Sequence, residues 1–134
     1  MPALPWRTLQ AIDSDRQYMA MASHLPLRSR RGIPGFLRDT MRIRRQLAHA
    51  PGLVGYALDA ELTRKTFWTF SAWVDEPSLS EFAAAEPHRQ LAQRLQPQLA
   101  ETRFRFFPIR GRDLPLSWGE VRRRLAAGTP ARRP

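Results

Sequence analysis

Apolar residues follow two different spacings in the first half of the chain. Residues 17–25 are apolar at both even and odd positions, which predicts a short strand that is covered on both faces. Residues 33–48 repeat their apolar positions every three to four residues, which predicts a helix with Pro34 in its first turn. Residues 49–52 (HAPG) end this helix, because proline cannot continue it and glycine accepts a left-handed backbone.

The second half of the chain alternates strand-like and helix-like segments. Residues 53–61 and 66–74 predict two strands joined by a short turn, a hairpin. Asp75 predicts the start of a helix, because its carboxylate can accept a backbone N–H there, and a second helical segment begins at Pro87. Residues 103–109 (RFRFFPI) predict a fourth strand, and the proline within it indicates a sheet edge or a strand end.

A short C-terminal helix is predicted from Ser117 onward. Ser117 and Glu120 have the spacing of a capping box, in which the Ser117 side chain accepts from the Glu120 amide and the Glu120 carboxylate reaches back to the Ser117 amide. We expect this helix to bury Trp118, Val121 and Leu125.

The order of these elements predicts the α+β class and a ferredoxin-like βαββαβ fold with an extra C-terminal helix. This fold places both main helices on one face of a four-stranded antiparallel sheet. Because the strands are apolar on both sides, we expect a second copy of the chain to stack sheet to sheet, giving a homodimer. The single domain is predicted to span residues 17–128, with 1–16 as an N-terminal extension and 129–134 as a flexible tail.

The composition narrows the chemistry. The chain has 134 residues, of which 43% are hydrophobic, so it is long and apolar enough to bury its own core. It contains no cysteine, which excludes disulfides, a thiol nucleophile and cysteine-based metal sites. The segment of residues 1–16 contains prolines and aspartates where a signal peptide needs an apolar stretch, and no run approaches the ~20 apolar residues of a membrane span. We therefore expect a cytoplasmic protein without membrane contact.

The net charge of +10 comes almost wholly from arginine, since Lys65 is the only lysine. Residues 28–45 carry seven arginines against one acid, and residues 101–134 carry nine against three, whereas the segment between them is slightly acidic. Evolved nucleic-acid surfaces normally use lysine as well, and few aromatic residues stand among these arginines. The sequence therefore argues against nucleic acid and favours solvated faces, or a clamp for an anionic ligand near a pocket rim. The candidates for that clamp are Arg28, Arg30, Arg31 and Arg42.

Two segments resemble a known family. Residues 67–82 (FWTFSAWVDEPSLSEF), followed by Pro87, His88 and Arg89, and residues 51–56 (PGLVGY) are similar to antibiotic-biosynthesis-monooxygenase-like proteins of the dimeric α+β barrel superfamily. The resemblance covers about residues 17–112. It implies a dimeric α+β barrel. It leaves the reaction open, because the superfamily includes cofactor-free oxygenases of polycyclic phenols and anthrones, heme enzymes, polyketide cyclases, lactone isomerases and members without known activity.

The heme-degrading branch of that superfamily provides a test. Its pattern is an asparagine on the first strand, then a tryptophan and a heme-ligating histidine in the helix after the third strand. The corresponding residues here are Ser23, Phe82 and Ala92, so all three differ. The sequence therefore predicts no cofactor, with heme on His88 as the alternative.

Two histidines are candidate site residues. His88 falls on the apolar stripe of its helix, together with Leu91, where it is either a buried histidine bonded to a backbone carbonyl or water, or a general base. An imidazole suits proton abstraction because its ordinary pKa of ~6.5 lies near working pH. His24 ends the first strand and should lie near Phe67 and Trp68 on an antiparallel neighbour; it is either a surface histidine or a substrate contact.

Aromatic side chains supply the remaining candidates. Trp68 and Trp73 have opposite parity, so at most one of them faces a pocket between helices and sheet. We assign Trp68 to that role, stacking on a planar substrate and donating its N–H to an oxyanion, with core packing as the alternative for both. Apolar walls would come from five residues: Phe36, Met41, Tyr56, Phe70 and Phe82.

These expectations combine into one leading hypothesis. The chain is a small dimeric, cofactor-independent monooxygenase that acts on a hydrophobic aromatic or polyketide-type substrate with O₂, with His88 as base and Trp68 as stacking or oxyanion residue. The alternative is a non-catalytic or heme-binding ligand module of the same fold.

Overall fold

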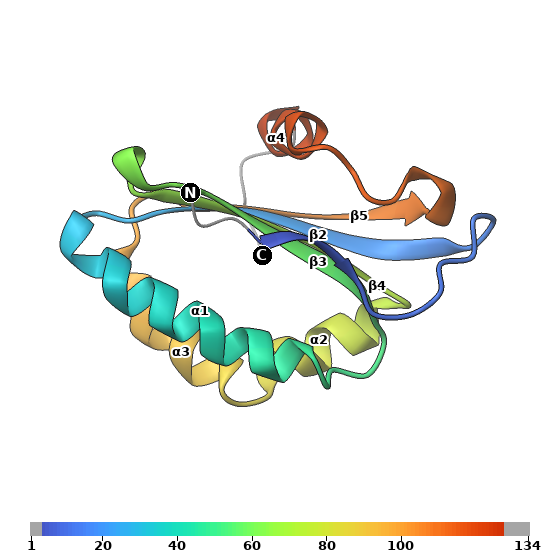
Figure 1. Ribbon diagram of the computed structural model, residues 1–134, viewed down its shortest axis with the longest axis horizontal. Helices are drawn as coiled ribbons and strands as arrows, with labels where there is room; N and C mark the ends of the chain where they lie inside the picture. Colours follow the sequence, from blue (N-terminus) through green and yellow to red (C-terminus); the bar gives the residue numbers. More distant parts are fainter. Residues whose placement is uncertain (1–3, 128–134) are drawn as a thin grey trace.

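The computed structural model describes residues 4–127, which form a five-stranded antiparallel sheet with helices on both faces (Figure 1). The strand order is β1-β3-β4-β2-β5. The strands are β1 (Leu4–Thr8), β2 (Gln17–Pro26), β3 (Leu53–Glu61), β4 (Thr66–Trp73) and β5 (Arg103–Arg110). The helices are α1 (Ile33–Leu47), α2 (Glu76–Ala84), α3 (His88–Leu95) and α4 (Trp118–Ala127). The predicted ferredoxin-like order is confirmed; the expected tail at 129–134 lies outside the described residues.

The sheet has one strand more than the sequence predicts. β1 belongs to the segment interpreted as an N-terminal extension, and it pairs antiparallel with β3. Trp6 on β1 packs over Gly55 and lies 5.9 Å from the ring of Phe70. A Cβ at Gly55 would overlap the Trp6 ring, so glycine is required for this close approach. The short, proline-containing β1 shows no alternation of its own, which is why the pattern of apolar residues did not reveal it.

α1, α2 and α3 cover one face of the sheet (Figure 1). Phe36 of α1 stacks on Phe67 of β4 with ring centroids 3.9 Å apart, and both side chains are buried. At the other end of this face Trp73 packs against Phe82, and its indole N–H donates to Ser71 Oγ at 2.9 Å. We call this side of the sheet the α1–α3 face.

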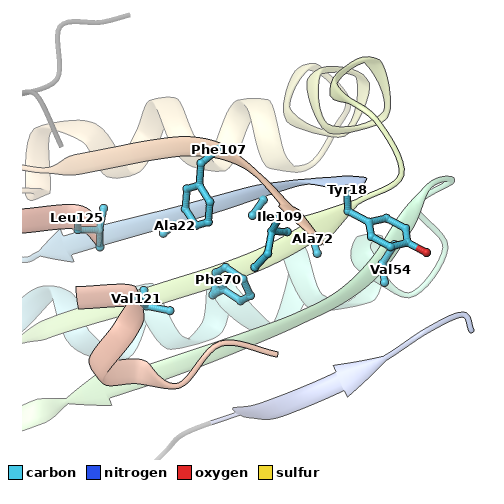
Figure 2. Close-up of a cluster of buried hydrophobic side chains, with 10 residues drawn as sticks. Tyr18, Ala22, Val54, Phe70, Ala72, Phe107, Ile109, Val121 and Leu125 are labelled. Atoms are coloured by element: carbon cyan, nitrogen blue, oxygen red, sulfur yellow. The ribbon is translucent and has the colours of Figure 1, made fainter. Parts of the chain in front are cut away.

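α4 covers the opposite face, which we call the α4 face (Figure 1). Val121 and Leu125 of α4 point toward Ala22, Phe70 and Phe107 of the sheet, and all five are buried (Figure 2). The predicted homodimer rested on a chain with helices on one face only, whereas α4 gives this chain a second helical layer. The apolar surface on which a second copy was expected to stack is already covered, so the dimer stays a prediction without that support.

The caps explain where the helices begin. The predicted Asp75 cap is confirmed, since the Ser78 N–H donates to its carboxylate at 2.9 Å. Ser117 Oγ likewise accepts from the Glu120 N–H at 3.2 Å. The second half of the predicted capping box is absent, because the Glu120 carboxylate instead pairs with Arg123 and Arg124. Among residues 4–127, no helix has the length and apolarity needed to cross a bilayer.

Candidate functional site

Strand parity divides the predicted site residues between the two faces of the sheet. His24, Trp68 and Phe70 lie on the α4 face, as even-numbered residues of β2 and β4. His88 contacts Phe82, which packs on Trp73 on the α1–α3 face. The predicted base and the predicted oxyanion residue are therefore separated by the sheet, and a single pocket cannot contain both.

His24 and Trp68 are brought together by the pairing of β2 with β4. They are directly opposite in the register, as the sequence predicts, and their rings stack with centroids 3.9 Å apart at 18°. His24 Nε2 is hydrogen-bonded to Thr66 Oγ1 at 2.6 Å, so the imidazole is held both by its face and by one nitrogen.

Arg122 of α4 completes a three-layer stack. Its guanidinium carbon lies 4.5 Å from the centre of the Trp68 ring. Because His24 fills one face of the indole, the guanidinium must occupy the other. Asp59, opposite Trp68 on β3, holds the guanidinium through its carboxylate, with Arg122 Nη2 donating at 3.0 Å. The predicted stacking of a substrate on Trp68 is therefore not available, since both faces of the indole are occupied.

Two donors in this stack have no hydrogen-bond partner among residues 4–127. They are Trp68 Nε1 and Arg122 Nε, and both atoms are buried. Buried N–H groups in proteins are nearly always paired, and leaving one unpaired costs about 1–3 kcal/mol. The two donors belong to side chains that touch each other, so both are available to an acceptor placed beside the stack.

A hollow of about 300 Å³ lies beside the stack. We call it the His24–Trp68 hollow; its lining consists of His24, Trp68, Glu101, Arg103, Arg122, Leu125 and Ala126. It combines an imidazole, two arginines, one carboxylate and a small apolar wall from α4. This is the inventory of a site that can take up a proton and stabilise a negative charge.

The electrostatics keep His24 neutral. Burial lowers its pKa below the usual 6.5, the positive charges of Arg103 and Arg122 lower the pKa further, and Glu61 opposes them. A neutral imidazole at pH 7 can act as a base, and the two arginines that disfavour its charged form would favour an anion beside it.

His88 has a different environment at the junction of α2 and α3. Its backbone N–H donates to Gln46 Oε1 at 2.9 Å, and its Nδ1 is 3.1 Å from the carbonyl oxygen of Ala83. Gln46 also donates to the carbonyl oxygen of Phe82 at 3.3 Å, which joins α1 to this junction. Burial lowers the pKa of His88, while the hydrogen bond with Ala83 opposes the shift. The geometry matches the structural interpretation of this residue, a half-buried histidine bonded to a backbone carbonyl.

A second hollow, of about 360 Å³, adjoins this junction. Gln46, His49 and Phe82 line it together with residues of the 50–51 and 78–86 segments, but His88 does not. Within residues 4–127, no group of three or more histidine, aspartate and glutamate side chains is arranged to hold a metal ion.

The remaining predicted residues do not form a pocket together. Phe36 and Phe70 are core residues on opposite faces of the sheet. Tyr56 is buried, and its hydroxyl accepts a hydrogen bond from Arg44 Nε at 3.3 Å. Met41 and Arg42 are exposed on α1 and line neither of the two hollows. Arg42 therefore lies near neither hollow, and the arginines that line the first hollow are Arg103 and Arg122.

Three residues around His24 and Trp68 were not among the predicted site residues: Arg103 and Arg122, which line the hollow, and Thr66, which is hydrogen-bonded to His24. The register of the β3–β4 hairpin could have revealed part of the site, because Asp59 stands opposite Trp68, and Trp68 in turn stands opposite His24 on β2. The strand register does not reveal the position of α4, because the local sequence does not determine on which face of the sheet a terminal helix packs.

The comparisons with known proteins extend the fold result. No family model matches the sequence, and no curated protein does. Solved structures are similar. SnoaB, a cofactor-independent oxygenase from Streptomyces nogalater, shares 15% identity with a TM-score of 0.57, over 67% of this chain and 90% of that one. A conserved protein from Methanosarcina mazei shares 15% identity with a TM-score of 0.61, and the match covers 67% of this chain and 90% of that one. An antibiotic biosynthesis monooxygenase shares 13% identity with a TM-score of 0.60, and the match covers 66% of this chain and 95% of that one. These likenesses confirm the predicted antibiotic-biosynthesis-monooxygenase-like fold.

Proposed function

We propose that this protein is a cofactor-independent monooxygenase that acts on a hydrophobic aromatic or polyketide-type substrate with O₂, and that His24, rather than His88, is its base. The observation that carries the proposal is the meeting of a neutral imidazole with two buried, unpaired N–H donors at one hollow. The fold comparison supports the reaction class, since one structure of similar fold is a cofactor-independent oxygenase.

His24 removes the proton that starts the reaction. When its Nε2–H donates to Thr66 Oγ1, the lone pair on Nδ1 is free to accept a proton from an acidic C–H or O–H group of the substrate. Burial and the charges of Arg103 and Arg122 lower the pKa of His24, which favours the unprotonated imidazole that a base requires.

Trp68 and Arg122 stabilise the anion that this step creates. The Trp68 N–H and the Arg122 Nε–H are fixed before the substrate arrives, because His24 and Asp59 hold the two side chains in the stack. Donors that are oriented in advance in a dry site stabilise developing charge without reorganising.

The chemistry balances without a cofactor. The substrate carbanion reduces O₂ and combines with it to form a peroxide at that carbon. Loss of water from the peroxide then leaves a carbonyl, so a CH₂ group becomes C=O, one oxygen atom enters the substrate and the other leaves as water. The substrate itself is the reductant, and the chain supplies a base and hydrogen-bond donors.

Oxygen uptake tests this proposal. The purified protein, treated with a chelator, is expected to consume O₂ when given an anthrone-type or hydroxynaphthalene-type substrate. Trp68→Phe keeps a ring between His24 and Arg122 but removes the N–H, and it should lower kcat about 10²–10³-fold. Trp118→Phe is the matched control, because Trp118 packs in the core of the same face but does not line the hollow.

Two results would contradict the proposal. Absence of substrate-dependent O₂ uptake across the panel would remove the assigned reaction. Uptake at equal rates in wild type and Trp68→Phe would remove the indole N–H from the mechanism.

A further inference from the structure

The His24–Trp68 hollow offers more hydrogen-bond donors than a neutral hydrocarbon can use. Trp68 Nε1 and Arg122 Nε have no partner among the described residues, and Arg103 forms no ion pair among them. A purely apolar ligand would displace water from these groups and leave them unpaired, which is unfavourable. A ligand that carries an anionic acceptor would pair them with charge-assisted hydrogen bonds.

The charged residues that line the hollow also favour an anion, because two arginines stand against one carboxylate. Asp59 pairs with the Arg122 guanidinium through Nη2, and Arg122 Nε is buried without a partner among residues 4–127. Glu101 is the one acid in the lining and, like Arg103, forms no ion pair among residues 4–127. Glu101 therefore opposes an anionic ligand, while Arg103 and Arg122 attract it.

Size limits the ligand further. The volume of about 300 Å³ lies at the lower end of the range for small-molecule pockets, ≈ 300–1,000 Å³. Leu125 and Ala126 provide an apolar wall for a flat ring, and one face of the His24 ring is already taken by Trp68. A space of this size suits one or two fused rings.

We infer that the His24–Trp68 hollow binds a planar aromatic acid of one or two rings as its anion, with Arg103 and Arg122 as the residues that select the charge. This inference deepens the proposed function and rests on the same site. It narrows the substrate class from hydrophobic aromatic compounds in general to small aromatic acids.

Calorimetric titration with a matched pair of probes tests the inference. The probes are 2-naphthoate, which is anionic, and 2-naphthamide, which has the same shape but is neutral. We expect 2-naphthoate to bind about 10-fold or more tightly than the amide, the size of one charge-assisted contact. Arg103→Gln and Arg122→Gln should each weaken 2-naphthoate about 10-fold and weaken the amide, which carries no charge, much less.

Two further variants make the test specific. Glu101→Gln removes the opposing carboxylate and should tighten 2-naphthoate without affecting the amide. Arg123→Gln is the control, because Arg123 lies next to Arg122 on α4, is largely exposed, pairs with Glu120 and does not line the hollow. If Arg122→Gln fails to fold because Asp59 loses its partner, Arg103→Gln and Glu101→Gln still decide the question, since both replace exposed side chains.

The outcomes separate this inference from the proposed function. Binding of 2-naphthoate that depends on Arg103, without O₂ uptake from any substrate, would support the site and overturn the oxygenase. Trp68-dependent O₂ uptake combined with equal affinity for the two probes would overturn the anion selectivity and leave the oxygenase standing. Failure of both probes to bind at millimolar concentration would overturn the inference.

Discussion

The two faces of the sheet each hold a histidine beside an aromatic ring, and they differ in what surrounds it. On the α1–α3 face, His88 lies next to Phe82, and its Nδ1 and backbone N–H are satisfied by Ala83 and Gln46. On the α4 face, His24 lies in a stack with Trp68 and Arg122 in which two buried donors have no partner among the described residues.

This comparison shows that a half-buried histidine whose pKa is lowered by burial does not by itself indicate a site. Burial is the largest cause of the lowered pKa in both residues. Only His24 has arginines that add to the shift, and only His24 lines one of the two hollows. The unpaired donors and the nearby charges are what distinguish the surroundings of His24 from those of His88.

Truncating the core of each face should separate stability from the site. Phe67 is fully buried and stacks on Phe36, so Phe67→Ala should lower the free energy of unfolding by about 3–5 kcal/mol. Val121→Ala removes less buried volume under α4 and should cost about 2 kcal/mol. Urea denaturation measures both values.

The same two variants should differ in ligand binding. Val121 lies on the helix that carries Arg122, so Val121→Ala should weaken 2-naphthoate, whereas Phe67→Ala should leave the affinity of the folded fraction unchanged. Equal loss of binding in both variants would contradict the independence of the two faces.

The close approach of β1 to β3 predicts a smaller loss of stability. Gly55→Ala places a methyl group inside the Trp6 ring and should cost about 1–3 kcal/mol, with faster proteolysis near β1. Gly35→Ala is the matched control, because only the Arg38 side chain lies near its Cβ position, at 3.9 Å, in helix α1. It should stabilise the protein by about 0.5–1 kcal/mol. Loss of stability in Gly35→Ala alone would contradict this account.

The cap of α4 predicts a loss of about 1 kcal/mol. Ser117→Ala removes the oxygen that accepts the Glu120 N–H, which typically costs that amount. Arg123→Ala changes only an exposed side chain on the same helix and should produce no measurable change. Thermal denaturation of the two variants distinguishes the contributions, and a larger loss in Arg123→Ala would show that the cap is not what stabilises the start of α4.

The pH dependence of activity predicts the smallest effect. Since the pKa of His24 lies below 6.5, activity should fall only as the pH drops through that lowered value. Burial is the largest cause of the lowered pKa of His24, and the charge of Arg103 is the next. Arg103→Gln removes that charge, so the acid limb of the pH–rate profile should move upward toward 6.5. Arg122 still lowers the pKa in this variant, and Glu61 still raises it. An acid limb that does not move, or that moves downward, would contradict the assignment of His24.

The lowered pKa of His24 also makes the fold less stable at acid pH. Above pH 6.5 His24 is neutral in both the folded and the unfolded chain, so it contributes no pH dependence there. As the pH falls below 6.5, the unfolded chain binds a proton first, and the fold loses stability until the folded pKa is passed. His88 acts in the same sense, because burial lowers its pKa also.

Much of the fold could be predicted from the sequence because the signals are local. Apolar spacing gave the strands and helices, and Asp75 and Ser117 marked the helix starts through hydrogen bonds to nearby amides. β1 was missed because five residues that contain a proline carry no periodicity, and its place depends on Gly55, about fifty residues away in the sequence.

The site was less accessible because it depends on distant contacts. The pairing of His24 with Trp68 followed from antiparallel topology and was confirmed. Strand parity showed that Trp68 and Trp73 face opposite sides of the sheet. Parity does not show which side α4 covers, and the residues that contact Trp68 depend on the position of α4. Arg122 reaches Trp68 only because α4 docks where a second copy of the chain was expected.

The most direct test of the account compares the two histidines in one assay. His24→Gln and His88→Gln are measured for kcat/KM in substrate-dependent O₂ uptake, with circular dichroism to confirm that both variants fold. The account predicts that His24→Gln loses about 10²–10⁴-fold, the usual contribution of a general base, while His88→Gln stays within a few-fold of wild type. A large loss in His88→Gln with full activity in His24→Gln would contradict it and return the site to the α1–α3 face.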